Sequence, residues 1–274
     1  MGNMIKSIKS ILRNFLPRGI RTHRIRSGLL RSKKIVTSWH DYPAAILGRT
    51  ERPLLNWFSM NVKPGETWLD IGAHYGYTAI ALSRLVGESG RVFAFEPMLS
   101  TAGYVTQTRR LNNFTQMTVV PFGLAVPETL EIISLPVTRG MVDSTLVKDG
   151  GGKRKEKSEG IKKKEWLETI MLARFDWLWL RICGTDDRID GVKIDVQGME
   201  IEVLTGMIET LRSQHPKLVV ELHRGVDREK FLHTIELAGY ACDAVPIEPV
   251  EGEVSPLYVD DHSYFFHKPN GAGT

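Results

Sequence analysis

Apolar runs of strand length alternate with segments of helical periodicity from Glu66 onward. Nearly continuous apolar strands separated by such helices are typical of a parallel sheet buried on both faces. The pattern therefore predicts an α/β fold, Rossmann-like and doubly wound, with a mostly parallel sheet. Core strands are predicted at TWLDIGA, RVFAFEP, MTVVPFGL, GVKIDVQ and KLVVELH, an additional strand at LEIISLPV, and closing strands at YACDAVPI and SYFFHK. Helices are predicted at YTAIALSRLVG, STAGYVTQTRRLNN, MEIEVLTGMIETLRS and REKFLHTIELAG.

Three parts of the chain are predicted from this pattern. A basic extension covers residues 1–48, the main domain covers residues 49–268, and residues 269–274 form a tail. The segment TERPLLNWFSMNV, with Thr50 before Pro53, predicts a helix that leads into the domain.

The start of the extension has an amphipathic pattern. Between Ile5 and Leu16 the Ile, Leu and Phe residues fall on one helical face, and the three basic residues fall elsewhere. We therefore expect a basic N-terminal helix, which Pro17 would end. Two interpretations stay open: a helix lying on an anionic membrane surface, and a segment that packs on the domain or stays mobile.

A second segment, VKDGGGKRKEKSEGIKKKE at residues 147–165, has no apolar stripe before Ile161. Its Lys and Gly content predicts a solvated, mobile loop rather than an anion-binding patch. Because the loop lies between the third and fourth core strands, it could also act as a flap over a site at that edge.

The charge distribution separates the extension from the body. The first 34 residues hold ten Lys or Arg and no acid, whereas the remaining 26 basic residues face 32 acidic ones. A mildly acidic body argues against nucleic acid as a partner. The two cysteines have no metal-ligand spacing, and we expect neither a signal peptide nor a membrane-spanning run of about 18 apolar residues. These features predict a cytoplasmic protein, with the inner membrane surface as the alternative location.

A glycine turn follows the first core strand. Asp70 precedes Gly72 and Gly76, which allow the backbone to approach a ligand closely at the edge where open α/β sheets bind ligands. A dinucleotide site would need G-x-G-x-x-G, which this G-x-x-x-G turn lacks. With Glu96 at the end of the second strand to accept both ribose hydroxyls, the turn favours an S-adenosylmethionine pocket in which Asp70 holds the methionine ammonium, directly or through water.

A second polar group is predicted at the same sheet edge. Asp195 ends the fourth strand, Glu200 lies in the following first helical turn, and Glu221 and His223 end the fifth strand on one side. Asp195 or His223 could act as a base, and Glu200 either contributes to the site or complements the helix N-terminus. An Asp-Glu-His group could also bind a divalent ion, although we assign no metal here.

The motifs DIGAHYGYTAIAL, VFAFEP, LNN, VKIDVQGMEIEVLTGM and VVELH, in this order, resemble the FkbM-type methyltransferases of the class I S-adenosylmethionine-dependent superfamily. The resemblance spans Leu69 to Lys268 and implies a seven-stranded sheet with one antiparallel edge strand. The chain departs from the family pattern at Gln197, where an acid is usual, and at His74, where an asparagine is frequent. ARFDW around Asp176 is the nearest match to a further family element. The resemblance implies that Asp70, Gly72 and Gly76 form the cofactor loop, that Glu96 binds the ribose, and that Asp195 and Glu200 match the D-x-E-G-x-E element. From the resemblance together with strand position, we assign the catalytic group to Asp195, His223 and Glu200, and the cofactor contacts to Asp70, Gly72, Ala73, His74, Tyr75, Gly76, Glu96, Pro97 and Gly123.

The resulting hypothesis is an S-adenosylmethionine-dependent O-methyltransferase. The resemblance implies a hydroxyl acceptor on a sugar, a lipid-linked glycan or a secondary metabolite, with N-methylation as a variant. Two alternatives stay open: a nicotinamide-dependent oxidoreductase on the same fold, and a non-catalytic, cofactor-binding module associated with a membrane.

Overall fold

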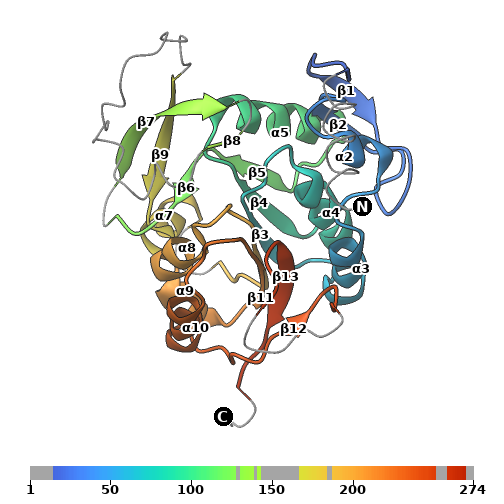
Figure 1. Cartoon of the computed structure of the whole chain (residues 1–274). Coiled ribbons are helices and arrows are strands. Elements are labelled where there is room, and N and C mark those ends of the chain that lie inside the picture. The colour runs from blue at the N-terminus through green and yellow to red at the C-terminus, as the bar shows by residue number, and fades with distance from the viewer. Residues whose placement is uncertain are drawn as a thin grey trace, which may run out of the picture.

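The computed structural model describes residues 15–127, 130–138, 141–142, 167–183, 187–250 and 258–269. Its centre is a seven-stranded sheet in the order β12-β13-β11-β10-β3-β4-β5 (Figure 1). Parallel pairing joins β11, β10, β3, β4 and β5, and β13 runs antiparallel to both its neighbours. The strands are β3 (Thr67–Ile71), β4 (Arg91–Phe95), β5 (Met117–Val120), β10 (Gly191–Ile194), β11 (Lys217–Leu222), β12 (Val245–Pro246) and β13 (His262–Phe266). The predicted doubly wound sheet is confirmed.

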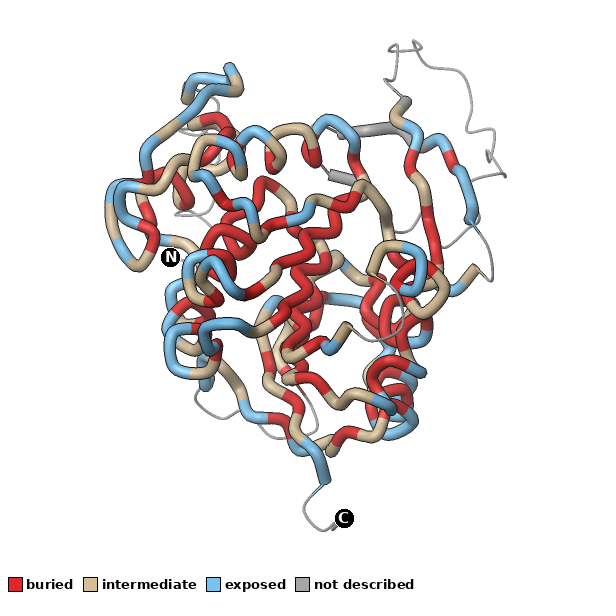
Figure 2. Tube along the Cα trace, turned by 180° about the vertical axis from the view of Figure 1, so that it is seen from behind, coloured by how far each residue is buried: buried red, intermediate tan, exposed pale blue. Residues whose placement is uncertain are grey.

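Helices cover both faces of this sheet, and alternating strand residues feed two cores (Figure 1). Trp68 of β3 packs in the core shared with α3 and α4, whereas its neighbour Leu69 packs in the core shared with α7 to α10. The buried positions run through the central strands (Figure 2). The helices are α3 (Arg52–Asn61), α4 (Tyr77–Val86), α5 (Leu99–Leu111), α7 (Phe175–Ile182), α8 (Glu200–Gly206), α9 (Ile208–Gln214) and α10 (Arg228–Leu237).

The structure corrects several predicted boundaries. The antiparallel strand β13 lies one position inside the edge, and only Val245–Pro246 of YACDAVPI forms the edge strand β12. The structure divides the single helix predicted after β10 into α8 and α9. At the end of α8 the backbone of Gly206 lies so close to Ala125 that a Cβ on Gly206 would be 2.2 Å from the Ala125 carbonyl oxygen. MTVVPFGL also divides, because Pro121 has no N–H for a continued ladder.

A smaller sheet lies beside the main one in the order β6-β9-β7-β8. LEIISLPV belongs to it as β7, which pairs antiparallel with β9, rather than adding to the central sheet. The strands are β6 (Gly123–Leu124), β7 (Glu131–Thr138), β8 (Met141–Val142) and β9 (Leu167–Ala173). The loop predicted at residues 147–165 lies outside the described residues.

The N-terminal segment packs on the main domain. A hairpin of β1 (Arg21–Arg24) and β2 (Lys34–Thr37) precedes the short helix α2 (Pro43–Leu47). The Val36 amide donates to Thr108 Oγ1 at 2.9 Å, and the side chain of Asn112, which caps the C-terminus of α5, bonds both the amide and the carbonyl of Lys34. The amphipathic segment Ile5–Leu16 falls almost wholly outside the described part of the chain. Within the described ranges, no helix combines the length and the apolarity needed to span a bilayer.

Candidate functional site

The turn after β3 depends on glycine geometry. Gly72 has φ of 82°, and a Cβ there would lie 1.8 Å from the Asp195 carbonyl oxygen. The amides of Gly72 and Ala73 both donate to the Phe95 carbonyl at 3.1 and 2.9 Å, which ties the turn to the end of β4. Gly76 also has φ of 82° and precedes α4. The turn therefore brings bare backbone against the ends of two neighbouring strands.

A buried lysine lies beneath this turn. Lys193 Nζ lies 3.0 Å from Asp70 Oδ1 and 3.3 Å from Asp195 Oδ2, and it approaches the Gly72 carbonyl at 3.5 Å. Thr78 Oγ1 donates to the other oxygen of Asp70 at 2.7 Å. Burial alone would lower the pKa of Lys193, but the two carboxylates outweigh it and raise that pKa. Asp70 is fully buried and is held by groups of the protein, so its contact with a cofactor ammonium stays a prediction.

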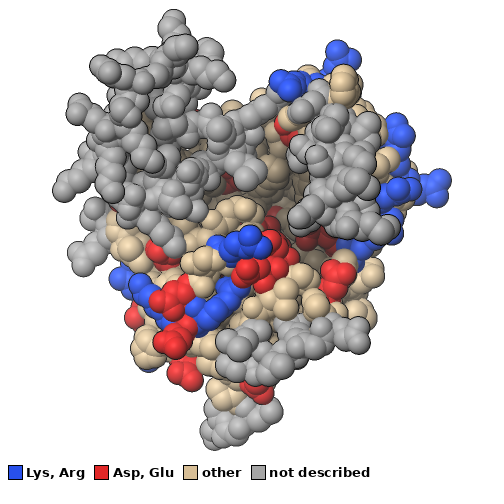
Figure 3. Space-filling model, in the orientation of Figure 1, with Lys and Arg blue, Asp and Glu red and all other residues tan. Residues whose placement is uncertain are grey.

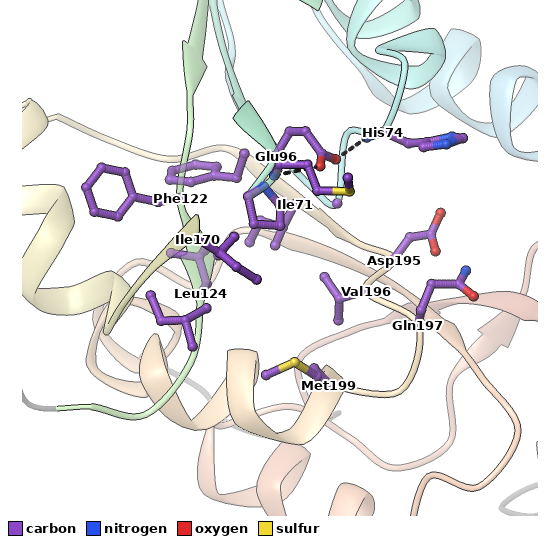
Figure 4. A pocket seen from close by; sticks show the side chains of 16 residues that line it. Ile71, His74, Glu96, Phe122, Leu124, Ile170, Asp195, Val196, Gln197 and Met199 are labelled. Atoms are coloured by element: carbon purple, nitrogen blue, oxygen red, sulfur yellow. Dashed lines mark hydrogen bonds between the residues drawn. The ribbon is translucent and has the colours of Figure 1, made fainter. Parts of the chain in front are cut away.

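A pocket of about 210 Å³ opens at the carboxyl ends of β3, β4 and β10 (Figure 4). Phe122, Leu124 and Ile170 give it an apolar side, and Asp195 and Gln197 lie on the other side. Of the predicted cofactor contacts, Gly72, His74, Glu96, Pro97 and Gly123 line this pocket. An apolar slot next to isolated polar groups is the usual form of a site for a small organic ligand.

Glu96 is one of two acidic residues that line the pocket. Its two carboxylate oxygens accept from the amides of His74 at 2.9 Å and Met98 at 3.1 Å (Figure 4). The residue is only 6% exposed, and burial raises its pKa to about 7 despite these two hydrogen bonds. The amides fix the carboxylate while leaving acceptor capacity on both oxygens. The predicted contact of Glu96 with the two hydroxyls of a ribose stays a prediction.

The second predicted group is assembled next to the pocket. His223 Nε2 lies 3.5 Å from Asp195 Oδ1 and 3.5 Å from Glu221 Oε1. On its other side, His223 Nδ1 donates to Glu200 Oε1 at 2.7 Å, and Glu200 is fully buried. The Gln197 amide donates to Nε2 at 2.8 Å. The ends of two strands, β10 and β11, and the start of α8 therefore hold a histidine between three carboxylates.

Burial and mutual charge shift the pKa values in this group. Burial, together with the charges of Asp195 and Glu51, raises the pKa of Glu221 to about 7. Burial would lower the pKa of His223, but the hydrogen bond to Glu200 and the nearby carboxylates raise it overall. The raised pKa of Glu221 brings this carboxylate close to neutrality, which suits a general base.

Aromatic rings brace the outer side of the glycine turn. The ring of Tyr42 lies 5.4 Å from that of His74, which itself lies 4.4 Å from Tyr75. Burial lowers the pKa of His74 to about 4, so its imidazole is neutral at physiological pH. His74 has a positive φ of 49°, a conformation that asparagine adopts more readily. The His74 ring packs here against Tyr42 of the N-terminal segment and against Tyr75 of the turn itself.

Sequence reasoning located most of this geometry but missed two members. Lys193, a lone cation within the apolar run GVKI, was the available signal for the buried ion pair. Glu51, which lines a neighbouring hollow with Glu221, gave no signal because it precedes the regular pattern. Asp176 lies elsewhere: its carboxylate accepts from the Glu209 and Thr210 amides at the start of α9. Ala73, Tyr75 and Gly76 belong to the turn without lining the pocket described above.

The solved structures that resemble this fold include the following three. A methyltransferase FkbM from Methylobacillus flagellatus has 17% identity and a TM-score of 0.46, covering 77% of this chain and 50% of that one. Aeropyrum pernix fibrillarin with natively bound S-adenosyl-L-methionine has 14% identity and a TM-score of 0.44, covering 90% and 82%. A Thermotoga maritima SAM-dependent O-methyltransferase has 13% identity and a TM-score of 0.44, covering 90% and 77%. This chain therefore spans about half the length of the Methylobacillus protein. No curated protein matches it.

The family model for the methyltransferase FkbM domain matches residues 70–242. That range begins at the buried acid Asp70 and contains the glycine turn, Glu96 and the group around His223. The match favours a methyltransferase over the nicotinamide-dependent alternative, in agreement with the missing third glycine. The chain belongs to the FkbM family of S-adenosylmethionine-dependent methyltransferases.

Proposed function

We propose that this chain transfers the methyl group of S-adenosylmethionine to a hydroxyl of a sugar, a lipid-linked glycan or a secondary metabolite. The observation that carries the proposal is the position of Glu96. Its carboxylate is fixed by two amides at the wall of an apolar pocket, and Asp195 lies on the other side of the same pocket. A nucleoside with a diol and a charged sulfur fits such a pocket, because the apolar wall can receive the base and the acids can receive the polar parts.

The residues present fit the cofactor. Glu96 would receive the ribose hydroxyls, and Phe122, Leu124 and Ile170 would enclose the adenine. Gly72 and Ala73 would present bare backbone to the amino-acid part. Bound S-adenosylmethionine supplies an electrophilic methyl group on a positively charged sulfur.

The chain's own task is then to orient the acceptor and to take its proton. As the oxygen–carbon bond forms and the carbon–sulfur bond breaks, the hydroxyl proton must leave. Glu221 and Asp195 both lie within 3.5 Å of His223 Nε2, and Glu221 is the acid whose pKa is raised to about 7. Glu221 or Asp195 would accept the proton, while Glu200 holds the His223 ring in place through Nδ1. Alignment contributes the larger part of the acceleration, and the base adds about 10²- to 10⁴-fold.

Calorimetry with S-adenosylhomocysteine tests the cofactor half of this proposal. We expect one site per chain in the wild type and a loss of affinity of about tenfold or more in Glu96→Ala. Absence of binding by a folded sample would contradict the assignment.

The acceptor half requires a radiolabel. Tritiated methyl transfer into fractionated cell extract, followed by mass spectrometry of the product, would identify the acceptor. Cofactor binding without transfer into any fraction would instead support a non-catalytic module.

A further inference from the structure

The carboxylates and the histidine next to the pocket form a coordination set of mixed oxygen and nitrogen atoms. One ligand atom each from Asp195, Glu221 and His223 lies within 4.8 Å of the other two. His223 Nε2 is 3.5 Å from the nearest oxygen of each acid. Two ligands at right angles on an ion with bonds of about 2.1 Å lie about 3.0 Å apart, so small side-chain shifts would close this set around a divalent ion.

The histidine is oriented as in a metal site. Its Nδ1 donates to Glu200 Oε1 at 2.7 Å, which directs Nε2 toward Asp195 and Glu221. Metal-ligating histidines generally donate their second ring nitrogen to a carboxylate in this way, which fixes the tautomer. The Glu200 side chain is fully buried, and the His223 side chain is only 9% exposed. The direction of Nε2 is therefore set by the fold rather than by a mobile surface side chain.

The local charge also favours a cation. Asp195 shares Lys193 with Asp70, and two further carboxylates, Glu200 and Glu221, lie at His223. On the face shown in Figure 3, acidic side chains gather beside and within the hollow near the middle of the molecule. A divalent ion at His223 would offset this excess.

We propose that Asp195, Glu221 and His223 bind one divalent transition-metal ion of the Mn²⁺ class. The imidazole ligand favours a first-row transition ion over Mg²⁺ or Ca²⁺, which prefer oxygen alone. Gln197, whose Nε2 lies 2.8 Å from His223 Nε2, must yield this position to the ion. Rotation of its amide would present Oε1 instead. The replacement of the usual family acid by Gln197 therefore does not remove the site, because all three ligands come from other positions.

The ion's role rests on the proposed function. Beside the pocket that contains Glu96, a metal-bound acceptor hydroxyl would lose its proton more readily and would be fixed for attack on the methyl group. Metal binding itself does not depend on that role. Failure of cofactor binding and failure of metal binding are therefore separate results.

Titration of EDTA-treated, full-length protein with MnCl₂ tests the site, with free Mn²⁺ followed by electron paramagnetic resonance. We expect one Mn²⁺ per chain in the wild type and an affinity at least tenfold lower in Glu221→Gln and His223→Gln. Glu229→Gln, which removes an exposed acid on α10, should leave the affinity unchanged. Affinity for S-adenosylhomocysteine within about threefold of wild type would show that the variants are folded.

Spin-echo modulation from a ¹⁴N nucleus should be present with bound Mn²⁺ and absent in His223→Gln. Wild-type protein that binds no Mn²⁺, binding that survives both site substitutions, or bound Mn²⁺ without ¹⁴N coupling would overturn the proposal. Methyl transfer into extract should fall at least tenfold in EDTA and return with Mn²⁺. Transfer unaffected by EDTA would overturn the role assigned to the ion.

Discussion

Lys193 and Asp70 are direct partners across the β10–β3 ladder, and Lys193 Nζ lies 3.0 Å from Asp70 Oδ1 with both side chains almost completely buried. The pair holds a charged core under the glycine turn. Removing one partner of a buried ion pair leaves the other charge without compensation, which costs more than the intact pair contributes.

Lys193→Met should therefore destabilise the protein by about 3–5 kcal/mol, because Asp70 would remain buried without its cation. Urea unfolding measures the change. The double variant Lys193→Met/Asp70→Asn should recover part of the loss, since it removes both charges. A single-variant loss below about 1 kcal/mol would show that Asp70 is relieved by water or by protonation.

Gly72→Ala should destabilise the protein by about 3 kcal/mol or more, since the new Cβ would lie 1.8 Å from a carbonyl oxygen and φ is 82°. Binding of S-adenosylhomocysteine should fall with it. Gly103→Ala in α5 is the matched control, because nothing lies within 4 Å of its Cβ position. The free energy of unfolding of Gly103→Ala should rise by about 0.5–1 kcal/mol, because alanine has the higher helix propensity. Equal effects in the two variants would contradict the role of the turn.

Glu96 should make stability depend on pH. Its pKa is about 7 in the folded protein against 4.5 for a free side chain, so the folded state binds a proton that the unfolded state has released. The free energy of unfolding of wild type, relative to Glu96→Gln, should therefore fall as pH rises from 4.5 to 7, by about 3 kcal/mol in total. Chemical unfolding of both proteins across this range measures the difference. Glu221 titrates in the same range, but it is present in both proteins, so its contribution to the pH dependence cancels in the difference. A difference that does not change with pH would refute the raised pKa.

Asp195→Asn should separate binding from turnover. Because the amide cannot accept a proton, methyl transfer should fall about 10²- to 10⁴-fold, whereas affinity for S-adenosylhomocysteine should stay within about threefold. Asp187→Asn, which breaks the surface ion pair with Arg91, is the control and should change neither quantity. A parallel collapse of cofactor affinity in Asp195→Asn would place Asp195 in cofactor binding instead.

The central sheet could be predicted because each core strand has a nearly continuous apolar run and each helix has one apolar face. The errors of the sequence-based prediction come from contacts between segments that are distant in the sequence. The break at Met207 depends on the close approach of Gly206 to Ala125, a contact between segments about 80 residues apart in sequence. The second sheet depends on the pairing of Gly123–Leu124 with β9. No local sequence pattern predicts this pairing.

The polar group at the sheet edge was predictable for the same reason, since carboxyl ends of parallel strands meet. Asp195, Glu221 and His223 each follow directly from strand position. What the sequence could not show is how the groups share their charges. That Asp70 turns inward to Lys193, and that His223 is held through Glu200, depends on register and on side-chain rotamers.

The ring of Tyr42 against His74 connects the glycine turn to residues that precede the family-matched range. Tyr75 reinforces this link through its hydroxyl, which donates to Asp41 at 3.4 Å. A recombinant fragment cut at residue 70 would keep every motif yet lose the wall that steadies its binding turn. Substitutions in this N-terminal segment could thus change ligand preference while the motifs themselves stay the same.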